Sequence, residues 1–198
     1  MKKDMTGIIL AGGKNSRMGT NKAFLEINGI RLIDNILAIY QNIFSEIIIV
    51  TNDPLSYTEF SDTIIVTDIY KEKGALGGIY TGLFYATYDY SFVAACDMPF
   101  LNEDFIIYLT GQANNKHDII VPQLPEGFQP LHAIYSKNCL SHINKLLSVN
   151  KLKIAGFYKE VRLFPVAEES IKPFNKDGRL FLNINTPEDL KKEQKGPF

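Results

Sequence analysis

The sequence is poor in the residues that build covalent cross-links and metal clusters. Only two cysteines, Cys96 and Cys139, occur in 198 residues, which fits a reducing compartment and gives no metal-ligand spacing. The three histidines, His117, His132 and His142, do not form a site by their spacing. No Ser/His/Asp or Cys/His arrangement can be argued from residue order either. We therefore do not expect nucleophilic catalysis by the protein.

The chain also lacks an excess of charge of one sign. It carries 21 Lys and Arg against 22 Asp and Glu, a formal net charge of −1. This balance argues against a general nucleic-acid or membrane-surface binder, so any anion site must be made locally. There is no apolar run of membrane-spanning length, and residues 1–6 lead into a short apolar run rather than a signal-peptide core. We expect a cytoplasmic protein with neither a nucleic-acid nor a membrane partner.

Strand-type and helical patterns alternate along the chain, as expected for a mostly parallel sheet covered on both faces. The strand-type runs are residues 6–10, 46–51, 63–67, 91–95, 118–121, 161–166 and 181–184. Helical patterns occupy residues 30–44, 76–88, 103–112 and 136–149 and a segment from residue 187, and Asn102, Ser136 and Thr186 are the expected N-caps of the last three. There is no internal repeat, low-complexity tract or linker. We predict an α/β fold, a single Rossmann-like three-layer domain with a mostly parallel central sheet spanning residues 1–198.

The most informative segment is the loop that follows the first strand, Leu10-Ala11-Gly12-Gly13, with Arg17 and Lys22 shortly after it. Glycine has no Cβ, so the backbone can approach a ligand and turn its N–H groups toward a phosphate. Arg17 can then neutralise a triphosphate as a planar fork and Lys22 as a point charge. The spaced glycines of dinucleotide-binding loops and the Gly-Lys-Ser/Thr of the common phosphate loop are both absent. The pattern predicts a nucleotide triphosphate cradle, against the alternative of an ordinary turn with solvent-facing basic residues.

Two acidic residues, Asp68 and Asp97, come directly after strands. In open parallel sheets, ligands bind outside the carboxyl ends of the strands. Carboxylates beside a cationic phosphate loop suit a divalent hard cation that bridges them to phosphate oxygens. We expect Asp97 to hold this metal and both residues to lie at the nucleotide. The competing interpretation is a turn or capping role, which weighs more heavily for Asp68.

Further polar and small residues complete the candidate site. Gly77 and Gly78 open a helix and could let a purine or ribose lie against the backbone, or could serve helix–sheet packing alone. Asn52 follows the second strand and could donate to a base or ribose, although a turn role is as plausible. Asn183 and Asn185 flank one isoleucine, so they would share a face of a strand and need polar partners, which we assign to the acceptor substrate.

Taken together, these residues resemble the molybdenum cofactor guanylyltransferases, the MobA family, within the nucleotidyltransferase superfamily. The resemblance runs through nearly the whole chain. The motifs that carry it, in the expected order, are Leu10-Ala11-Gly12-Gly13, Ser16-Arg17-Met18-Gly19 with Lys22, Leu76-Gly77-Gly78, Cys96-Asp97-Met98-Pro99-Phe100-Leu101, Pro130-Leu131-His132-Ala133 and Asn183-Ile184-Asn185-Thr186-Pro187. One departure is Asn21, where an Asp before the lysine is usual, and a basic acceptor end is not identifiable.

The resemblance implies a nucleotide-diphospho-sugar transferase-like fold with GTP and Mg²⁺ as ligands. It places Leu10, Ala11, Gly12, Lys22, Asp68 and Asp97 at the nucleotide, with Asp97 also on the metal. The acceptor would be molybdopterin or Mo-molybdopterin, whose terminal phosphate attacks the α-phosphorus of GTP and expels pyrophosphate. Arg17, Lys22 and Asp97 would carry the catalysis. Other proteins of molybdenum cofactor biosynthesis and apo-molybdoenzymes are the protein partners to expect.

Two other functions remain open from the residues. One is a different nucleotidyl transfer, cytidylyl transfer to molybdopterin or to a sugar phosphate. The sugar enzymes generally show Leu-Ala-Ala-Gly in place of Leu-Ala-Gly-Gly and need a longer chain. The other is a non-catalytic nucleotide-sensing module, which could dispense with the metal ligand, yet Lys22, Asp68 and Asp97 are all present.

Overall fold

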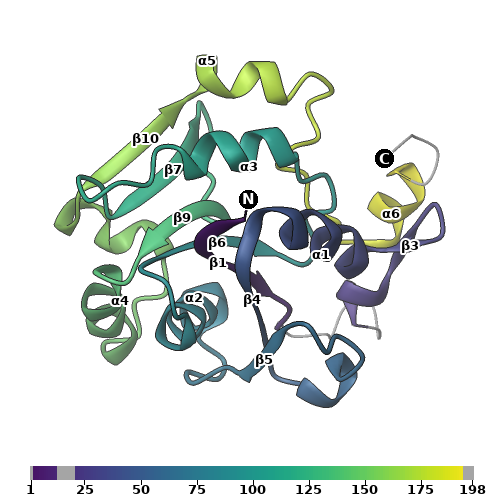
Figure 1. Cartoon of the computed structure of the whole chain (residues 1–198), viewed down its shortest axis with the longest axis horizontal. Helices are drawn as coiled ribbons and strands as arrows, with labels where there is room; N and C mark the ends of the chain where they lie inside the picture. The colour runs from purple at the N-terminus through teal and green to yellow at the C-terminus, as the bar shows by residue number, and fades with distance from the viewer. Residues whose placement is uncertain (1, 13–20, 194–198) are drawn as a thin grey trace.

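A central sheet with helices on both faces organises the protein, and the computed structural model describes it over residues 2–12 and 21–193 (Figure 1). Residues 13–20, which include the predicted site residues Gly13 and Arg17, lie outside the described residues. The strands of the main sheet are β1 (Lys3–Leu10), β4 (Phe44–Thr51), β5 (Ile64–Thr67), β6 (Tyr90–Ala95), β7 (Ile119–Leu124), β8 (Gly127–Phe128), β9 (His132–Ser136) and β10 (Leu163–Ala167). Their order is β10-β7-β9-β6-β1-β4-β5, with β8 paired to β7.

The sheet is mostly parallel, as predicted. Along the main path, β9 runs antiparallel to both of its neighbours, β6 and β7, whereas the other pairs are parallel. The carboxyl ends of β1, β4, β5 and β6 therefore meet at one edge. This edge is where the sequence places its candidate site.

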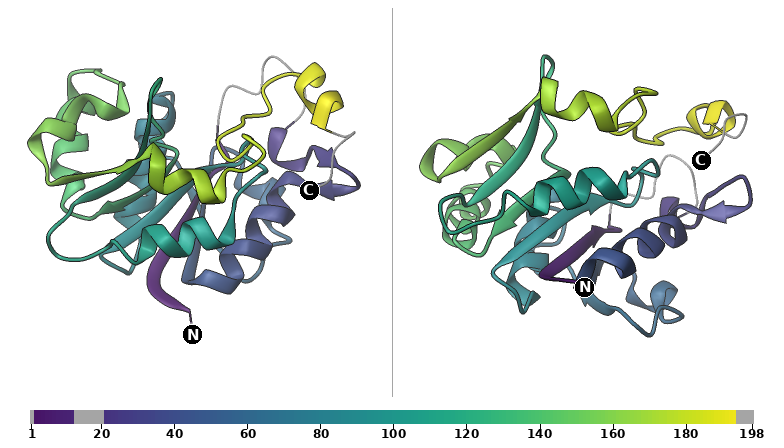
Figure 2. Two further views of the ribbon diagram at one scale, coloured as in Figure 1. Left: turned by 90° about the horizontal axis from the view of Figure 1, so that it is seen from above. Right: turned by 45° about the horizontal axis from the view of Figure 1, so that its top comes forward.

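Helices cover the two faces in separate layers. They are α1 (Leu32–Ile43), α2 (Gly74–Tyr85), α3 (Glu103–Thr110), α4 (Cys139–Ser148), α5 (Glu168–Ile171) and α6 (Pro187–Glu193). Short 3-10 turns are η1 (Lys22–Phe24), η2 (Pro54–Tyr57), η3 (Ile154–Glu160) and η4 (Lys172–Phe174). Helices α1 and α3 lie on one face and α2 and α4 on the other (Figure 2). The predicted α/β three-layer fold is confirmed.

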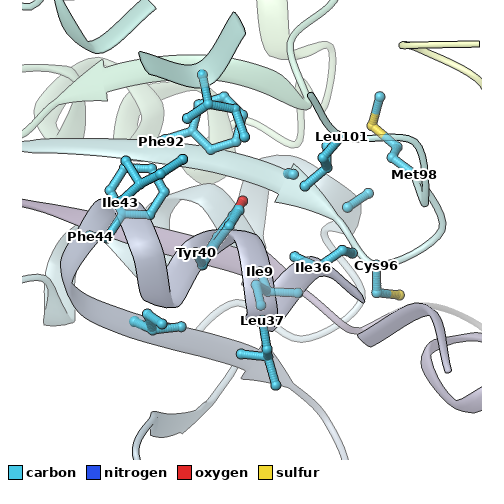
Figure 3. Close-up of a cluster of buried hydrophobic side chains, with 14 of the residues drawn as sticks. Ile9, Ile36, Leu37, Tyr40, Ile43, Phe44, Phe92, Cys96, Met98 and Leu101 are labelled. Atoms are coloured by element: carbon cyan, nitrogen blue, oxygen red, sulfur yellow. The ribbon is translucent and has the colours of Figure 1, made fainter. Parts of the chain in front are cut away.

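Strand β1 explains how the core splits into two layers. Successive side chains of a strand point to opposite faces. Ile9 accordingly packs with Ile36 and Tyr40 of α1, whereas Ile8 and Leu10 pack on the α2 side. Figure 3 shows Ile9 beside Ile36 and Tyr40 in the first of these clusters. A strand buried on both faces needs a continuous apolar run, which is what its carboxyl half carries.

Local signals fix several element ends. Asn28 and Gly29 have positive φ values of 52° and 79° and turn β2 (Glu26–Ile27) into β3 (Ile30–Arg31) as a hairpin, so α1 starts later than the expected residue 30. The Asn102 side chain accepts a hydrogen bond from the Phe105 N–H at 2.9 Å, which confirms this N-cap. Thr186 likewise accepts from the Asp189 N–H at 3.1 Å at the start of α6.

Two local predictions are wrong. Ser136 does not cap a helix, because it is the last residue of β9 and its backbone N–H donates to the Asp118 carbonyl at 2.7 Å; α4 begins only at Cys139. Residues 181–184 form no strand and run as an irregular segment, from which Ile184 buries its side chain against Ile27 and Leu32. No helix in the described part of the chain is long and apolar enough to cross a membrane.

Candidate nucleotide site at the strand tips

Backbone hydrogen bonds align three strand ends at the site. The Ala11 N–H donates to the Val50 carbonyl at 2.9 Å, which ties the end of β1 to β4. On the other side, the Cys96 N–H donates to the Leu10 carbonyl at 3.0 Å, which ties β6 to β1. Asp97 is the next residue after this bond. Its position is therefore set by the sheet rather than by a free loop.

Lys22 and Asp97 are brought together from residues 75 positions apart. The Lys22 Nζ lies 3.4 Å from the Asp97 Oδ2 and 2.9 Å from the Asn185 Oδ1. The Lys22 and Asp97 side chains are 29% and 21% exposed, so both still reach solvent. An ammonium, a carboxylate and an amide thus share one half-buried position at the edge of the sheet.

The carboxy-terminal segment completes this group. The Ile184 N–H donates to the Asp97 carbonyl at 2.8 Å, which places Asn185 beside Lys22. Asn183 and Asn185 are exposed on either side of the buried Ile184, so the predicted alternation holds although the predicted strand does not. Asn185 finds its polar partner in Lys22. The acceptor role of both asparagines stays a prediction.

Asp68 lies at the tip of β5 and serves the turn there. Its Oδ1 accepts from the Tyr70 N–H at 3.0 Å and from the Thr81 hydroxyl at 2.9 Å. Burial raises the pKa of Asp68 above its ordinary value, and these two hydrogen bonds act in the opposite direction. Oδ2 accepts no hydrogen bond from the described residues, so a turn role and a ligand role are compatible.

A small cavity opens between β1, β4, β5 and the start of α2. Its lining is Leu10, Gly12, Val50, Thr51, Asp68, Gly74, Ala75 and Gly78. A Cβ on Gly78 would lie 3.1 Å from the Leu10 Cδ2, so glycine lets α2 approach β1 closely and leaves the cavity open. Asn52 is exposed beside Gly12 and lines a neighbouring open hollow with Lys71 and Glu72. The structure therefore gathers Leu10, Ala11, Gly12, Asn52, Asp68 and Gly78 on one side of the edge and Lys22, Asp97 and Asn185 on the other.

The donor set fits a magnesium ion only in company with a ligand. Within residues 2–12 and 21–193, no group of three His, Cys, Asp or Glu side chains could hold a metal ion alone. Magnesium is commonly bound by one or two carboxylates together with substrate phosphates and water. Asp97 offers such a carboxylate at the end of β6 and next to Lys22. The residues thus fit a metal that arrives with a nucleotide.

Two buried titratable side chains near this edge stay out of the chemistry. Burial raises the pKa of the Cys96 thiol to about 12, so the thiolate is suppressed. His132 is fully buried among the rings of Phe92, Phe105 and Phe181, at 5.2, 5.5 and 5.1 Å, and its burial lowers its pKa to about 3. The structure gives neither residue access to a ligand at the strand tips.

Sequence reasoning missed two side chains that shape the site. Thr81 of α2 holds Asp68 through its hydroxyl, which also accepts from the Ile69 N–H at 2.9 Å. Tyr57 of η2 contacts both Ala11 and Asn21 through its hydroxyl. Asn21, the partner of Tyr57, could have been recognised from the sequence, because an Asn directly before a helical turn is a common N-cap. Tyr57 carried no such signal, since only the packing of the chain brings it to the loop.

Comparisons with known proteins identify the family of this chain. The family model of the MobA-like NTP transferase domain matches residues 7–161. A molybdenum cofactor guanylyltransferase from Desulfosudis oleivorans is 36% identical over 191 residues, which cover 96% of this chain and 94% of the relative. A probable molybdenum cofactor guanylyltransferase from Clostridium perfringens strain SM101 is 42% identical and covers 90% of each chain.

Solved structures give the same answer for the fold. Molybdopterin-guanine dinucleotide biosynthesis protein A from Archaeoglobus fulgidus is 25% identical, with a TM-score of 0.83 over 96% of this chain and 97% of its own. The 2-C-methyl-D-erythritol 4-phosphate cytidylyltransferase from Thermus thermophilus shares the fold alone, at 15% identity and a TM-score of 0.70 over 98% of each chain. The chain therefore belongs to the MobA-like NTP transferase family and is a nucleotidyltransferase.

Proposed function

We propose that this enzyme transfers GMP from GTP to the terminal phosphate of molybdopterin or Mo-molybdopterin. The products would be the molybdopterin guanine dinucleotide cofactor and pyrophosphate. Relatives that span nearly the whole chain at 36% and 42% identity are named molybdenum cofactor guanylyltransferases, which supports this substrate pair. The observation that carries the proposal is the Lys22–Asp97 pair, 3.4 Å apart at the strand tips, on the sheet edge that also holds a glycine-lined cavity.

The cavity and the Lys22–Asp97 pair would bind different parts of the nucleotide. The nucleoside would lie against the small hollow at Leu10, Gly12 and Gly78, with Asn52 and Asp68 as the polar groups at its rim. The triphosphate would then extend along the loop toward Lys22, where an ammonium can neutralise it as a point charge. Arg17, Gly13 and Ala11 would complete the phosphate contacts from the loop itself.

Asp97 is the residue that would hold Mg²⁺. When bound with the nucleotide, the ion would neutralise charge on the phosphate oxygens and help to align them. The pairing of Asp97 with Lys22 orients the carboxylate at the end of β6. Asp97 thus serves as a fixed anionic anchor, and it needs no proton transfer of its own.

The reaction asks for positioning and charge neutralisation rather than for a base. A terminal phosphate of the acceptor already carries negative charge near neutral pH, so its oxygen can attack the α-phosphorus directly. One phosphorus–oxygen bond forms there, and the bond to the β-phosphate oxygen breaks as pyrophosphate leaves. Lys22 would offset the negative charge that spreads over these oxygens, and Arg17 would share the task. Asn185, which contacts Lys22, and Asn183, exposed two residues before it, would orient the acceptor.

The decisive experiment compares nucleotides and acceptors on one preparation. We expect GTP with Mg²⁺ to raise the melting temperature more than CTP does, and a chelator to remove most of that rise. Pyrophosphate release should require both GTP and molybdopterin. Stabilisation by CTP but not GTP would refute guanylyl transfer and favour a cytidylyl enzyme. Nucleotide binding without pyrophosphate release for any acceptor would refute transfer itself.

A further inference from the structure

One hydroxyl contacts both ends of the glycine loop. The Tyr57 Oη lies 3.4 Å from the carbonyl oxygen of Ala11, where β1 ends. The same oxygen accepts a hydrogen bond from the Asn21 Nδ2 at 2.9 Å and lies 3.2 Å from the Asn21 Oδ1. Ala11 and Asn21 are the residues on either side of the stretch from residue 12 to residue 20. Tyr57 therefore ties together two points that are ten residues apart in the sequence.

Asn21 links Tyr57 to the turn that begins with Lys22. Its Oδ1 accepts from the Ala23 N–H at 3.2 Å and so caps η1, the turn that begins with Lys22. The Tyr57 ring also lies 5.1 Å from the ring of Phe24, the last residue of that turn. The turn is thus held at both ends by one side chain, through hydrogen bonds at its start and ring contact at its end.

Tyr57 is itself fixed by the core. It ends η2 and is fully buried in the cluster that packs on α1. A buried hydroxyl without partners would cost stability, and here the partners include Ala11 and Asn21, the residues that flank the loop. Burial raises the pKa of Tyr57 to about 12, so the hydroxyl keeps its proton at any working pH.

From this arrangement, and on the basis of the proposed nucleotidyl transfer, we propose that Tyr57 is a positioning residue that acts through Asn21 to hold Lys22 at the strand tips. The Asn21 amide donates to the Tyr57 oxygen, which leaves the hydroxyl proton for the Ala11 carbonyl or the Asn21 Oδ1. Closing a loop costs conformational entropy. The Tyr57 contacts hold the two ends of this loop together before the nucleotide binds, so that cost does not weaken binding. The ammonium of Lys22 is then already oriented when phosphate arrives.

The chain offers a matched control in Tyr40. It is also a fully buried tyrosine of the same cluster, and its hydroxyl lies 3.4 Å from the carbonyl oxygen of Ile8, on the same strand β1. Tyr40 contacts neither Ala11 nor Asn21 by any described hydrogen bond. Tyr57→Phe and Tyr40→Phe therefore each delete one buried tyrosine hydroxyl, and only the first touches the loop.

The test compares Tyr57→Phe, Tyr40→Phe and Asn21→Ala in the full chain. We expect Tyr57→Phe and Asn21→Ala each to lower kcat/KM for GTP about tenfold, the double variant to be little worse than either, and Tyr40→Phe to stay within twofold of wild type. Denaturant midpoints of the two Phe variants, measured alongside, show how much folding stability each hydroxyl contributes. If Tyr57→Phe matches Tyr40→Phe in kcat/KM, the inference is refuted. If Tyr57→Phe does not fold, wild-type kcat/KM in Asn21→Ala would refute the inference, because Tyr57 is proposed to act through Asn21.

A second comparison separates positioning of Lys22 from general damage. By calorimetric titration, Tyr57→Phe should weaken GTP binding about fivefold in the wild-type background and less than twofold in the Lys22→Ala background. An equal weakening in both backgrounds would show that Tyr57 does not act through Lys22. If the wild type binds and uses CTP instead of GTP, guanylyl transfer fails as a function, and the same two comparisons with CTP still test Tyr57.

Discussion

Removal of the Lys22 ammonium separates the cost to catalysis from the cost to folding. We expect Lys22→Ala to lose about three orders of magnitude in kcat/KM for GTP while its free energy of unfolding changes by less than about 1 kcal/mol. The two figures differ because they depend on different partners. In the free protein the lysine meets Asp97 and Asn185, and in the complex it would meet phosphate oxygens.

The catalytic figure follows from Coulomb's law. At about 4 Å and an effective dielectric constant of about 20, two unit charges interact with about 4 kcal/mol, which is about a thousandfold in rate. The stability figure follows from exposure. The Lys22–Asp97 pair is 3.4 Å long and its side chains are 29% and 21% exposed. A partly solvated ion pair of this kind contributes about 0–1 kcal/mol.

Lys172 supplies the matched control. Its Nζ lies 3.5 Å from the Glu168 Oε1 on the surface, so Lys172→Ala makes the same charge change and breaks the same kind of pair away from the strand tips. The assay is pyrophosphate release with GTP titration, together with urea unfolding of all three proteins. We expect Lys172→Ala to keep wild-type kinetics. A loss of less than tenfold for Lys22→Ala would refute the electrostatic role, as would a loss that merely follows a drop in the urea midpoint.

Two further predictions concern packing and pH. Gly78→Ala would put a Cβ 3.1 Å from the Leu10 Cδ2 at the cavity and should raise KM for GTP several-fold. The control Gly156→Ala, with the same 3.1 Å approach to the Leu146 Cδ1, should leave KM unchanged. Equal KM values in GTP titrations of the two variants would contradict a nucleoside at this cavity. Because burial lowers the pKa of His132 to about 3, the unfolded chain takes up a proton below about pH 6.5 that the folded chain does not. Acidification from pH 6 to pH 4 should therefore cost up to about 1.4 kcal/mol of unfolding free energy per pH unit through this histidine. In His132→Leu, the unfolding free energy measured with urea should fall less steeply with pH over the same range.

Local chemistry explains what the sequence could predict. Asn102 and Thr186 are recognisable N-caps because the donor and acceptor lie within three residues of each other, and both caps form. The apolar run that ends in glycine marks the end of β1 without any knowledge of its neighbours. Once the sheet is parallel, strand tips meet at one edge, so Asp68 and Asp97 had to lie near the loop.

Contacts between distant segments explain what it could not predict. Residues 181–184 carry the apolar alternation of a strand. The segment is instead joined to Asp97 by one backbone hydrogen bond, from the Ile184 N–H, and it packs on the β2–β3 hairpin. Alternation specifies which side chain is buried and leaves open what covers it. Tyr57 stands 36 positions from Asn21, and nothing in either local sequence indicates that they meet.

The bond between the Ile184 N–H and the Asp97 carbonyl has a consequence for how the enzyme matures on the ribosome. The central sheet is finished when β10 emerges at Ala167, yet Lys22 gains its amide partner only after Asn185 has been synthesised. A nascent chain would therefore complete its central sheet before Asn185 can reach Lys22. The core residues Ile171 and Leu180 emerge in the same late stretch, so the core and the site would be completed together.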